Sequence, residues 1–524
     1  MTAPQLLPNS APSAQSHLTL DPADWAEFRD LAHRMVDDSL EHLRTLSDRA
    51  PWQPVPPATR ASLANEPLPH AAQGAAAAYT QFSEEVLPYT NGNRHPRFWG
   101  WIQGNGTPLG MMADMLAAGM NAHLAGLDQS AKLVELKVIE WLAELMGFPK
   151  DSSGVLMSGG TMANLVGLAV ARHAKAGFDI RKDGLGGGPR LTVYASAEVH
   201  SWAQKSVELF GMGSSSLRKV PAGADLRMNV GALRRMITDD RAAGLRPICV
   251  IGTAGTVNSG AIDDLSAVAD VCEAEQLWFH VDGAFGALAA FSPSLRPLLA
   301  GMERADSLAF DLHKWGYLPY EIACVLVKDR VTHEGTFSVT PSYLVDEGRG
   351  VIAGGLPFAD RGIELTRNFK ALKVWLSFKA HGVDAIANVI EQNVAQARAF
   401  GEAVAKLPDA VIAAPVSLNI VCFRFAPVSL SPDEQDALNK EILLRVQETG
   451  LAVVSGSRIG GRYVIRVACS NHRSTWDDFE VLLAGLARIR GEIESGAISA
   501  ASITQHRVAG VNRVAATAPP PSAG

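Results

Sequence analysis

Between about His95 and Gly382, short runs of wholly apolar residues alternate with longer helical segments. Strands of this kind have no polar side, so both faces of their sheet must be covered, and helices between successive strands provide that cover. The runs and helices are expected at Gly154–Met157, Thr161–Ala176, Leu191–Ala195, Ile248–Gly252, Leu265–Glu275, Leu277–Val281, Ser307–Phe310 and Ala323–Val327. The pattern predicts an α/β fold with a mostly parallel sheet, in which ligands collect at the carboxyl ends of the strands.

The chain changes character after Gly382. Helices and alternating strands are expected at Val383–Leu407, Ser417–Arg424, Pro432–Thr449, Ala452–Ser455, Tyr463–Ala468 and Thr475–Ile493, which indicates a small α+β domain with an antiparallel sheet. Near the other end, a helix over Asp21–Leu46 has too little surface to fold alone and should pack on another body, such as a second subunit. We therefore expect a disordered N-terminus (1–19), a helical arm (20–94), a large domain (95–382), a small domain (383–495) and a disordered tail (496–524).

Composition narrows the class of protein further. Of the 524 residues, 47% are hydrophobic and 19% are charged, and the formal net charge is −7. These values are typical of a folded protein and provide no basic surface for nucleic acid. Five cysteines without a Cys-x-x-Cys pair predict neither a metal site nor a disulfide framework. With no apolar run of 18 residues and no leader sequence, we expect a cytoplasmic protein without membrane contact.

Two ionisable residues follow apolar strands where α/β folds bind ligands. Lys314 lies in the segment Asp311–Trp315, just past the strand Ser307–Phe310, although a surface lysine on a loop is the alternative interpretation. Asp282 ends the upstream run Leu277–Val281, where burying a carboxylate is costly unless a cation lies near it. The protonated ring nitrogen of pyridoxal 5′-phosphate (PLP) would be such a cation, whereas a helix cap is the alternative role.

Two further segments lie at strand ends of the same predicted sheet. Ser158–Thr161 (Ser-Gly-Gly-Thr) separates a strand from a helix, so its backbone N–H groups and the Thr161 hydroxyl suit an anion such as phosphate. Gly-Gly turns are common, and the segment alone is a weak signal. His200 follows the run Leu191–Ala195. A lone histidine is more often structural, but its place at a strand end favours a functional role.

Taken in order, these segments resemble the group II PLP-dependent amino-acid decarboxylases, the superfamily of aromatic-L-amino-acid and glutamate decarboxylases. The resemblance runs from about Trp25 to Ile493 and is carried by Ser158–Asn164, Tyr194–His200, Gly255–Asp263, His280–Gly286 and His313–Trp315. It implies PLP fold type I, with a large seven-stranded mostly parallel domain, a small α+β C-terminal domain, and a homodimer that shares its active sites.

The resemblance also implies a role for each matching residue. Lys314 would carry PLP as a Schiff base, Asp282 would pair with the ring nitrogen, and Ala284 would complete that pocket. His200 would stack on the ring. The residues implied near the phosphate or the ring substituents are Gly160, Thr161, His313 and Thr256.

Other matches concern the substrate. Tyr343 resembles a loop tyrosine that protonates the product carbon, and Arg367 matches an arginine that anchors the substrate carboxylate. An ordinary surface loop and a solvated charge at a helix start are the alternatives. Asp311 stands where the aromatic enzymes usually have asparagine, and Val257 where threonine is frequent. The wall of the substrate pocket is expected to include Trp101, Ile102, Gln103 and, at the subunit interface, His123.

The activity implied is decarboxylation of an L-amino acid, aromatic by family default, to its amine and CO₂. Polar or acidic substrates stay open, because Gln103, His123 and Ala125 depart from the aromatic enzymes. An aldehyde-forming oxidative decarboxylase or an aminotransferase on the same fold is the first alternative, and Tyr343 and His200 favour simple decarboxylation over it. A non-catalytic binding protein is the second, but such a protein is expected to lose the lysine or the aspartate.

Overall fold

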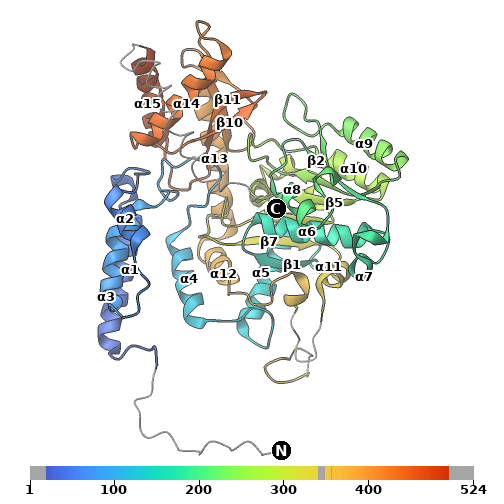
Figure 1. Cartoon of the computed structure of the whole chain (residues 1–524), viewed down its shortest axis with the longest axis horizontal. Coiled ribbons are helices and arrows are strands. Elements are labelled where there is room, and N and C mark those ends of the chain that lie inside the picture. The colour runs from blue at the N-terminus through green and yellow to red at the C-terminus, as the bar shows by residue number, and fades with distance from the viewer. Residues whose placement is uncertain (1–18, 340–347, 354, 356, 495–524) are drawn as a thin grey trace, which may run out of the picture. The chain divides into compact units, whose positions relative to one another are not determined.

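The computed structural model describes residues 19–339, 348–353, 355 and 357–494 (Figure 1). The described chain divides into two compact units, one within Met1–Thr45 and Pro57–Pro88 and the other within Leu46–Pro56 and Tyr89–Gly524. The second unit holds both sheets of the described chain, which are formed by residues on either side of Gly382. A domain boundary at Gly382 stays a prediction.

The first unit is helical, as expected for the arm. It contains α1 (Trp25–Arg44), α2 (Pro57–Asn65) and α3 (Ala75–Gln81), followed by a π-helical turn over Phe82–Val86. Asp24 begins α1, because its side chain accepts hydrogen bonds from the backbone N–H groups of Ala26 and Glu27. The predicted helix is therefore confirmed, with its start a few residues later than Asp21.

The second unit is built on a seven-stranded sheet with the order β1-β7-β6-β5-β4-β2-β3. Only β7 runs antiparallel to its neighbours, so the predicted mostly parallel sheet is confirmed. All residues of β1, β5, β6 and β7 are buried, which shows that both faces are covered. The strands are β1 (Ser153–Met157), β2 (Leu191–Ser196), β3 (Leu217–Val220), β4 (Arg246–Thr253), β5 (Trp278–Asp282), β6 (Ser307–Asp311) and β7 (Ala323–Val327).

Helices that precede, separate and follow these strands complete this part of the second unit. The central one is α6, which packs across β1, β4, β5, β6 and β7, while α9 and α10 pack on β4. Their bounds are α4 (Pro108–Met120), α5 (Ser130–Met146), α6 (Gly160–Lys175), α7 (Ile180–Asp183), α8 (Trp202–Leu209), α9 (Val230–Ala242), α10 (Leu265–Glu275), α11 (Arg330–Phe337) and α12 (Ala371–His381).

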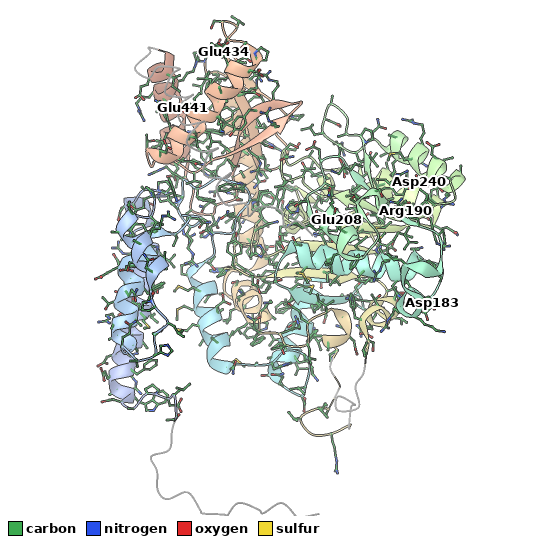
Figure 2. All side chains as sticks on the ribbon, in the orientation of Figure 1. Asp183, Arg190, Glu208, Asp240, Glu434 and Glu441 are labelled. Carbon is green, nitrogen blue, oxygen red and sulfur yellow. The ribbon has the colours of Figure 1, made fainter. Side chains whose placement is uncertain are left out.

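A second, antiparallel sheet with the order β10-β11-β9-β8 follows, as predicted. Its elements are α13 (Val383–Val404), β8 (Ala410–Ile412), β9 (Ile420–Phe425), α14 (Pro432–Glu448), β10 (Ser455–Ile459), β11 (Arg462–Ala468) and α15 (Trp476–Glu494). Glu434 and Ser431 form a capping box at the start of α14. Figure 2 labels Glu434. This sheet has its own core, in which Trp99 stacks on Phe479 with ring centroids 4.5 Å apart.

One predicted strand is displaced. A strand was expected over Ala452–Ser455, but β10 begins only at Ser455. Val453 instead forms an isolated bridge with Phe98, and its carbonyl accepts a 2.7 Å hydrogen bond from the backbone N–H of Trp99. The apolar run thus pairs with a segment more than 350 residues away along the chain rather than with its neighbour in the sheet.

Other features concern the whole described chain. None of its helices has the length and apolar character needed to cross a membrane, and within it no cluster of three His, Cys, Asp or Glu could hold a metal ion. The five cysteines are buried and free.

Candidate active site

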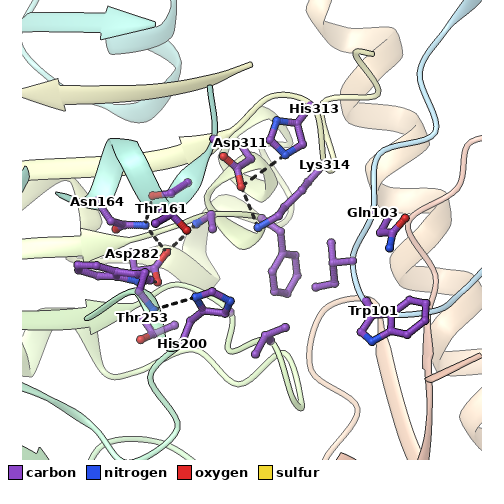
Figure 3. Close-up of a pocket in the computed structure, with 18 of the residues that line it drawn as sticks. Trp101, Gln103, Thr161, Asn164, His200, Thr253, Asp282, Asp311, His313 and Lys314 are labelled. Carbon is purple, nitrogen blue, oxygen red and sulfur yellow. Dashed lines mark hydrogen bonds and ion pairs between the residues drawn. The ribbon is translucent and has the colours of Figure 1, made fainter. Parts of the chain in front are cut away.

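A cavity of about 590 Å³ opens at the carboxyl ends of the large sheet's strands (Figure 3). The segments that follow β1, β2, β4, β5 and β6 all reach it, at the edge where open α/β sheets bind their ligands. Residues that line it include Trp101, Ile102, Gln103, Ser158, Gly159, Gly160, Thr161, Asn164, His200, Trp202, Thr253, Thr256, Val257, Asp282, Ala284, Asp311, His313 and Lys314. The cavity thus brings together most of the residues predicted from separate parts of the sequence.

Lys314 faces a buried carboxylate. Its Nζ lies 2.8 Å from Oδ2 of Asp311, the last residue of β6, which is 1% exposed (Figure 3). Burial lowers the pKa of Lys314, but the charge and hydrogen bond of Asp311 outweigh it, and the net effect raises the pKa. Asp311 is therefore the counter-ion of Lys314.

Asp282 ends β5 and is an acceptor for three donors. Its Oδ2 accepts from Nε1 of Trp202 at 2.6 Å, and its Oδ1 accepts from Nδ2 of Asn164 at 3.3 Å and from the backbone N–H of Ala284 at 3.1 Å. The next helical segment is a 3₁₀ turn that begins at Gly286. Asp282 is therefore not explained by the alternative role of capping the next helix, and its carboxylate is buried in the cavity wall.

The Ser-Gly-Gly-Thr segment leads from β1 into α6. Gly159 precedes the helix with no side chain capping it, so the first N–H groups of the helix are available to an anion. A Cβ atom on Gly160 would lie 2.8 Å from Oδ2 of Asp311, so the close approach of helix and strand requires glycine there. Thr161 lies at the same helix start (Figure 3).

Two histidines flank these groups. His313 contacts the backbone of Ile322 through Nδ1, and its Nε2 lies 3.8 Å from Oδ2 of Asp311. His200, between β2 and α8, accepts a 3.3 Å hydrogen bond at Nδ1 from the backbone N–H of Trp202. Burial lowers the pKa of both rings, so both are neutral at neutral pH.

A family model described as the pyridoxal-dependent decarboxylase conserved domain matches residues 57–426, which is more than half of the chain. The chain belongs to this family. An aromatic-L-amino-acid decarboxylase of Bacillus atrophaeus is 33% identical, and the match covers 89% of this chain and 96% of that protein. A phenylacetaldehyde synthase of Arabidopsis thaliana is 26% identical, over 86% of this chain and 93% of that protein. The crystal structure of Oryza sativa TDC with PLP and tryptamine superposes with a TM-score of 0.83 at 26% identity, covering 91% of this chain and all of that one.

The protein is therefore a PLP-dependent amino-acid decarboxylase with fold type I, as the resemblance implied. The cavity fits this cofactor. The primary amine of Lys314 suits its aldehyde, and the buried carboxylate of Asp282, which only accepts hydrogen bonds, suits its ring nitrogen. The uncapped helix start at Gly160–Thr161 suits its phosphate.

The substrate side of the decarboxylase is only partly as expected. Trp101, Ile102 and Gln103 line the cavity, and Nδ2 of Asn91 donates a 2.6 Å hydrogen bond to Oε1 of Gln103. His123 is exposed and lies with Tyr320 in a second hollow of about 530 Å³. Tyr343 lies outside the described residues.

Arg367 is not brought into the cavity with Lys314. It lies in the second hollow, where its Nη2 is 2.5 Å from Oε1 of Glu135 and also donates to the carbonyl oxygen of Leu156. Its Nη1 donates to the carbonyl oxygen of Leu124 at 2.8 Å. Both ends of this guanidinium are thus engaged within the chain.

A different arginine, which the sequence analysis missed, lies behind the cavity wall. Arg466, in β11, is 3% exposed and donates from Nη1 to the carbonyl of Trp101 and from Nε to the carbonyl of Asn258. Among the described residues its buried Nη2 has no hydrogen-bond partner. Burial lowers its pKa to about 10, which leaves it charged at neutral pH. A lone arginine between Ile465 and Val467 in an apolar strand was the signal that could have found it.

Proposed function

We propose that this decarboxylase acts on an aromatic L-amino acid and forms the corresponding amine and CO₂. The decarboxylation rests on the meeting of Lys314 and Asp282 in one cavity, from the ends of β6 and β5, and the aromatic substrate rests on the apolar wall of the same cavity. When bound, PLP supplies a ring that accepts the electrons left by the departing carboxylate.

We assign the roles from the family resemblance and from the place of each residue in the cavity wall. Lys314 would hold the aldehyde carbon of the cofactor, Asp282 would keep a proton on the ring nitrogen, and His200 would lie against the ring face. Gly160, Thr161 and His313 would receive the phosphate, and Ala284 and Thr256 would border the ring. Asp311 raises the pKa of the Lys314 amine and would serve as its counter-ion.

Arg466 is the better candidate for the substrate carboxylate. Its Nη2 is buried without a partner among the described residues, and its Nη1 donates to the carbonyl of Trp101 in the cavity wall. Nη1 and Nη2 of Arg367, by contrast, are engaged by Leu124, Leu156 and Glu135. An arginine can hold a carboxylate with parallel hydrogen bonds. The aromatic side chain is proposed from Trp101, Ile102 and Phe285 in the cavity wall and from the activity named for the Bacillus relative.

We also propose a homodimer with shared active sites. In the single chain, Met115, Leu116 and Met120 leave one side of α4 about half exposed and apolar, which suits burial against a second copy. His123 follows this helix and would then reach the partner's cavity. Sedimentation of the PLP-loaded protein should give a species of twice 55.7 kDa, and an active monomer at assay concentration would contradict the proposal.

The test of the function is a screen of amino acids for CO₂ release by the PLP-loaded protein, with the amine identified by mass spectrometry. We expect release from tryptophan, tyrosine or phenylalanine. Release confined to glutamate or another acidic amino acid would overturn the aromatic assignment while leaving decarboxylation intact.

A matched pair of variants tests the carboxylate anchor. Arg466→Met should raise KM on the order of a hundredfold, because a charged hydrogen bond to the carboxylate contributes about 1.5–3 kcal/mol. Arg424→Met, in the neighbouring strand β9, removes a guanidinium that pairs with Gln435 and should leave KM unchanged. Equal KM values for the two variants would exclude Arg466 from substrate binding.

A further inference from the structure

The proposed partner of the cofactor's ring nitrogen, Asp282, is itself held by side chains that the mechanism has not used. We propose that Trp202 and Asn164 are positioning residues that keep Asp282 ionised, so that it holds a proton on the ring nitrogen. The proposal rests on the assignment of Asp282 given above. Both residues are 1% exposed and lie in the wall of the same cavity.

The first argument is the number of acceptor positions on a carboxylate. The two oxygens of an ionised aspartate offer about four positions for hydrogen bonds. Trp202 takes one on Oδ2 at 2.6 Å, while Asn164 and the backbone N–H of Ala284 take two on Oδ1. One position is left for a donor from the cavity, which is what a protonated ring nitrogen offers.

The second argument is the direction of the hydrogen bonds behind Asn164. Nε1 of Trp278 donates to Oγ of Ser307 at 2.8 Å, and that oxygen lies 2.7 Å from Nδ1 of His280. Nε2 of His280 lies 2.8 Å from Oδ1 of Asn164, whose Nδ2 donates to the carbonyl of Gly160 and to Asp282. A carboxylate can only accept, so Asn164 donates to it through Nδ2 and accepts at Oδ1 from Nε2 of His280. When His280 is neutral, its Nδ1 then accepts from the Ser307 hydroxyl, and the bonds run toward the carboxylate.

His280 fits that direction only as a neutral ring with its proton on Nε2. The ring is fully buried, and a Cβ atom on Gly167 would lie 2.5 Å from its Cε1, so helix α6 fixes the ring in place. Burial lowers the pKa of His280 to about 4, which keeps the ring neutral at neutral pH. Asn164 is thereby held with its amide N–H groups toward Asp282.

Hydrogen bonds to the ionised form of a carboxylate make it a weaker base. With Trp202 removed, Asp282 becomes a stronger base and competes for the proton on the ring nitrogen. The Trp202 indole has no hydroxyl or amine that could itself take the proton of the ring nitrogen. Its removal should therefore change only whether this proton lies on Asp282 or on the ring nitrogen.

The test is solid-state ¹⁵N NMR of the protein reconstituted with PLP labelled at the ring nitrogen. The native protein should show the resonance of a protonated ring nitrogen. Trp202→Phe should shift this resonance toward that of the unprotonated ring and speed PLP release on the order of tenfold, because a hydrogen bond to a charged group is lost. Asn164→Leu should shift it in the same direction by less, since its bond to Asp282 is longer.

Controls separate this proposal from the assignment of Asp282. Trp99→Phe removes a buried indole whose Nε1 donates to Ser474 at 3.0 Å in the other core, and it should leave the resonance unchanged. Asp282→Asn should give the full shift. If Asp282→Asn shifts the resonance but Trp202→Phe and Asn164→Leu leave it unchanged, the positioning role is overturned. If Asp282→Asn gives no shift, the assignment of Asp282 fails. Should Trp202→Phe not fold, a native resonance in Asn164→Leu overturns the proposal by itself.

Discussion

The charges in the cavity are set by neighbours that are close in space but not always in sequence. Asp311 and Lys314 are three residues apart and pair directly, whereas Asp282 depends on Trp202 and Asn164, 80 and 118 residues away. Lys314 and Asp282 line the same cavity, where the lysine amine and the aspartate carboxylate suit the aldehyde and the ring nitrogen of the cofactor.

Replacement of Asp282 by asparagine should separate cofactor binding from catalysis. The variant keeps an acceptor oxygen and the phosphate site, so it should still bind PLP. It cannot hold a proton on the ring nitrogen, and we expect kcat to fall on the order of 10²–10³-fold, as for loss of one charge-stabilising group. Steady-state kinetics at saturating PLP measure this, and a near-native kcat would rule out the role.

The elements of the sheet could largely be predicted, because their signals are local. The strand Ala323–Val327 and the helix Leu265–Glu275 have the predicted bounds, and their apolar runs need no partner to be recognised. The short strand β3 and the partner of Val453 could not be, since both depend on pairing between distant segments. The ion pair of Arg367 could not be predicted for the same reason, because its neighbours in sequence suggest a free charge and only the fold brings Glu135 to it.

The pair of Arg367 and Glu135 should stabilise the packing of α5 against β1. Both side chains are almost fully buried, and burial raises the pKa of Glu135 against the opposing effect of Arg367. Arg367→Met leaves that carboxyl without its partner and should cost about 3–5 kcal/mol of unfolding free energy. Urea denaturation measures the loss. A change below about 1 kcal/mol would show that the pair is not needed for stability.

Tyr343 lies outside the described residues, and its role stays a prediction. A phenol at this position would deliver a proton to the carbon that has lost CO₂, a step that general acids typically accelerate about 10²–10⁴-fold. In Tyr343→Phe the carbon waits longer for a proton, so dioxygen competes, and we expect aldehyde and ammonia with oxygen uptake in place of much of the amine. Amine yield and oxygen consumption measured together test this, and native values for both would remove Tyr343 from the mechanism.

At the scale of the whole molecule, buried neutral histidines tie stability to pH. Burial lowers the pKa of His280 and His472 to about 4 and that of His333 to about 3. The unfolded chain, with histidine pKa values near 6.5, then binds more protons, so stability is complete above about pH 6.5 and declines as pH falls toward 4. Three acids act in the opposite direction, because burial raises the pKa of Asp263 to about 6 and also raises that of Glu135 and Asp306, but the histidines with a lowered pKa are more numerous.

Between pH 7.5 and 5 the expected decline is about 2 kcal/mol for each of these histidines, and urea denaturation over this range measures it. His333 contacts Ser153 and the carbonyl of Arg361, not the cavity residues, so His333→Gln should make the decline shallower without changing PLP binding. A pH profile as steep as that of the native protein would show that His333 does not contribute.

The most direct test of the whole account is the identity of the residue that binds the cofactor. Reduction of the PLP-loaded protein with borohydride, followed by digestion and mass spectrometry, should place the pyridoxyl group on Lys314, in the segment Asp311–Trp315. Lys314→Ala should lose both this adduct and all turnover. A reduced adduct on another lysine, or one that persists in Lys314→Ala, would contradict the site proposed here.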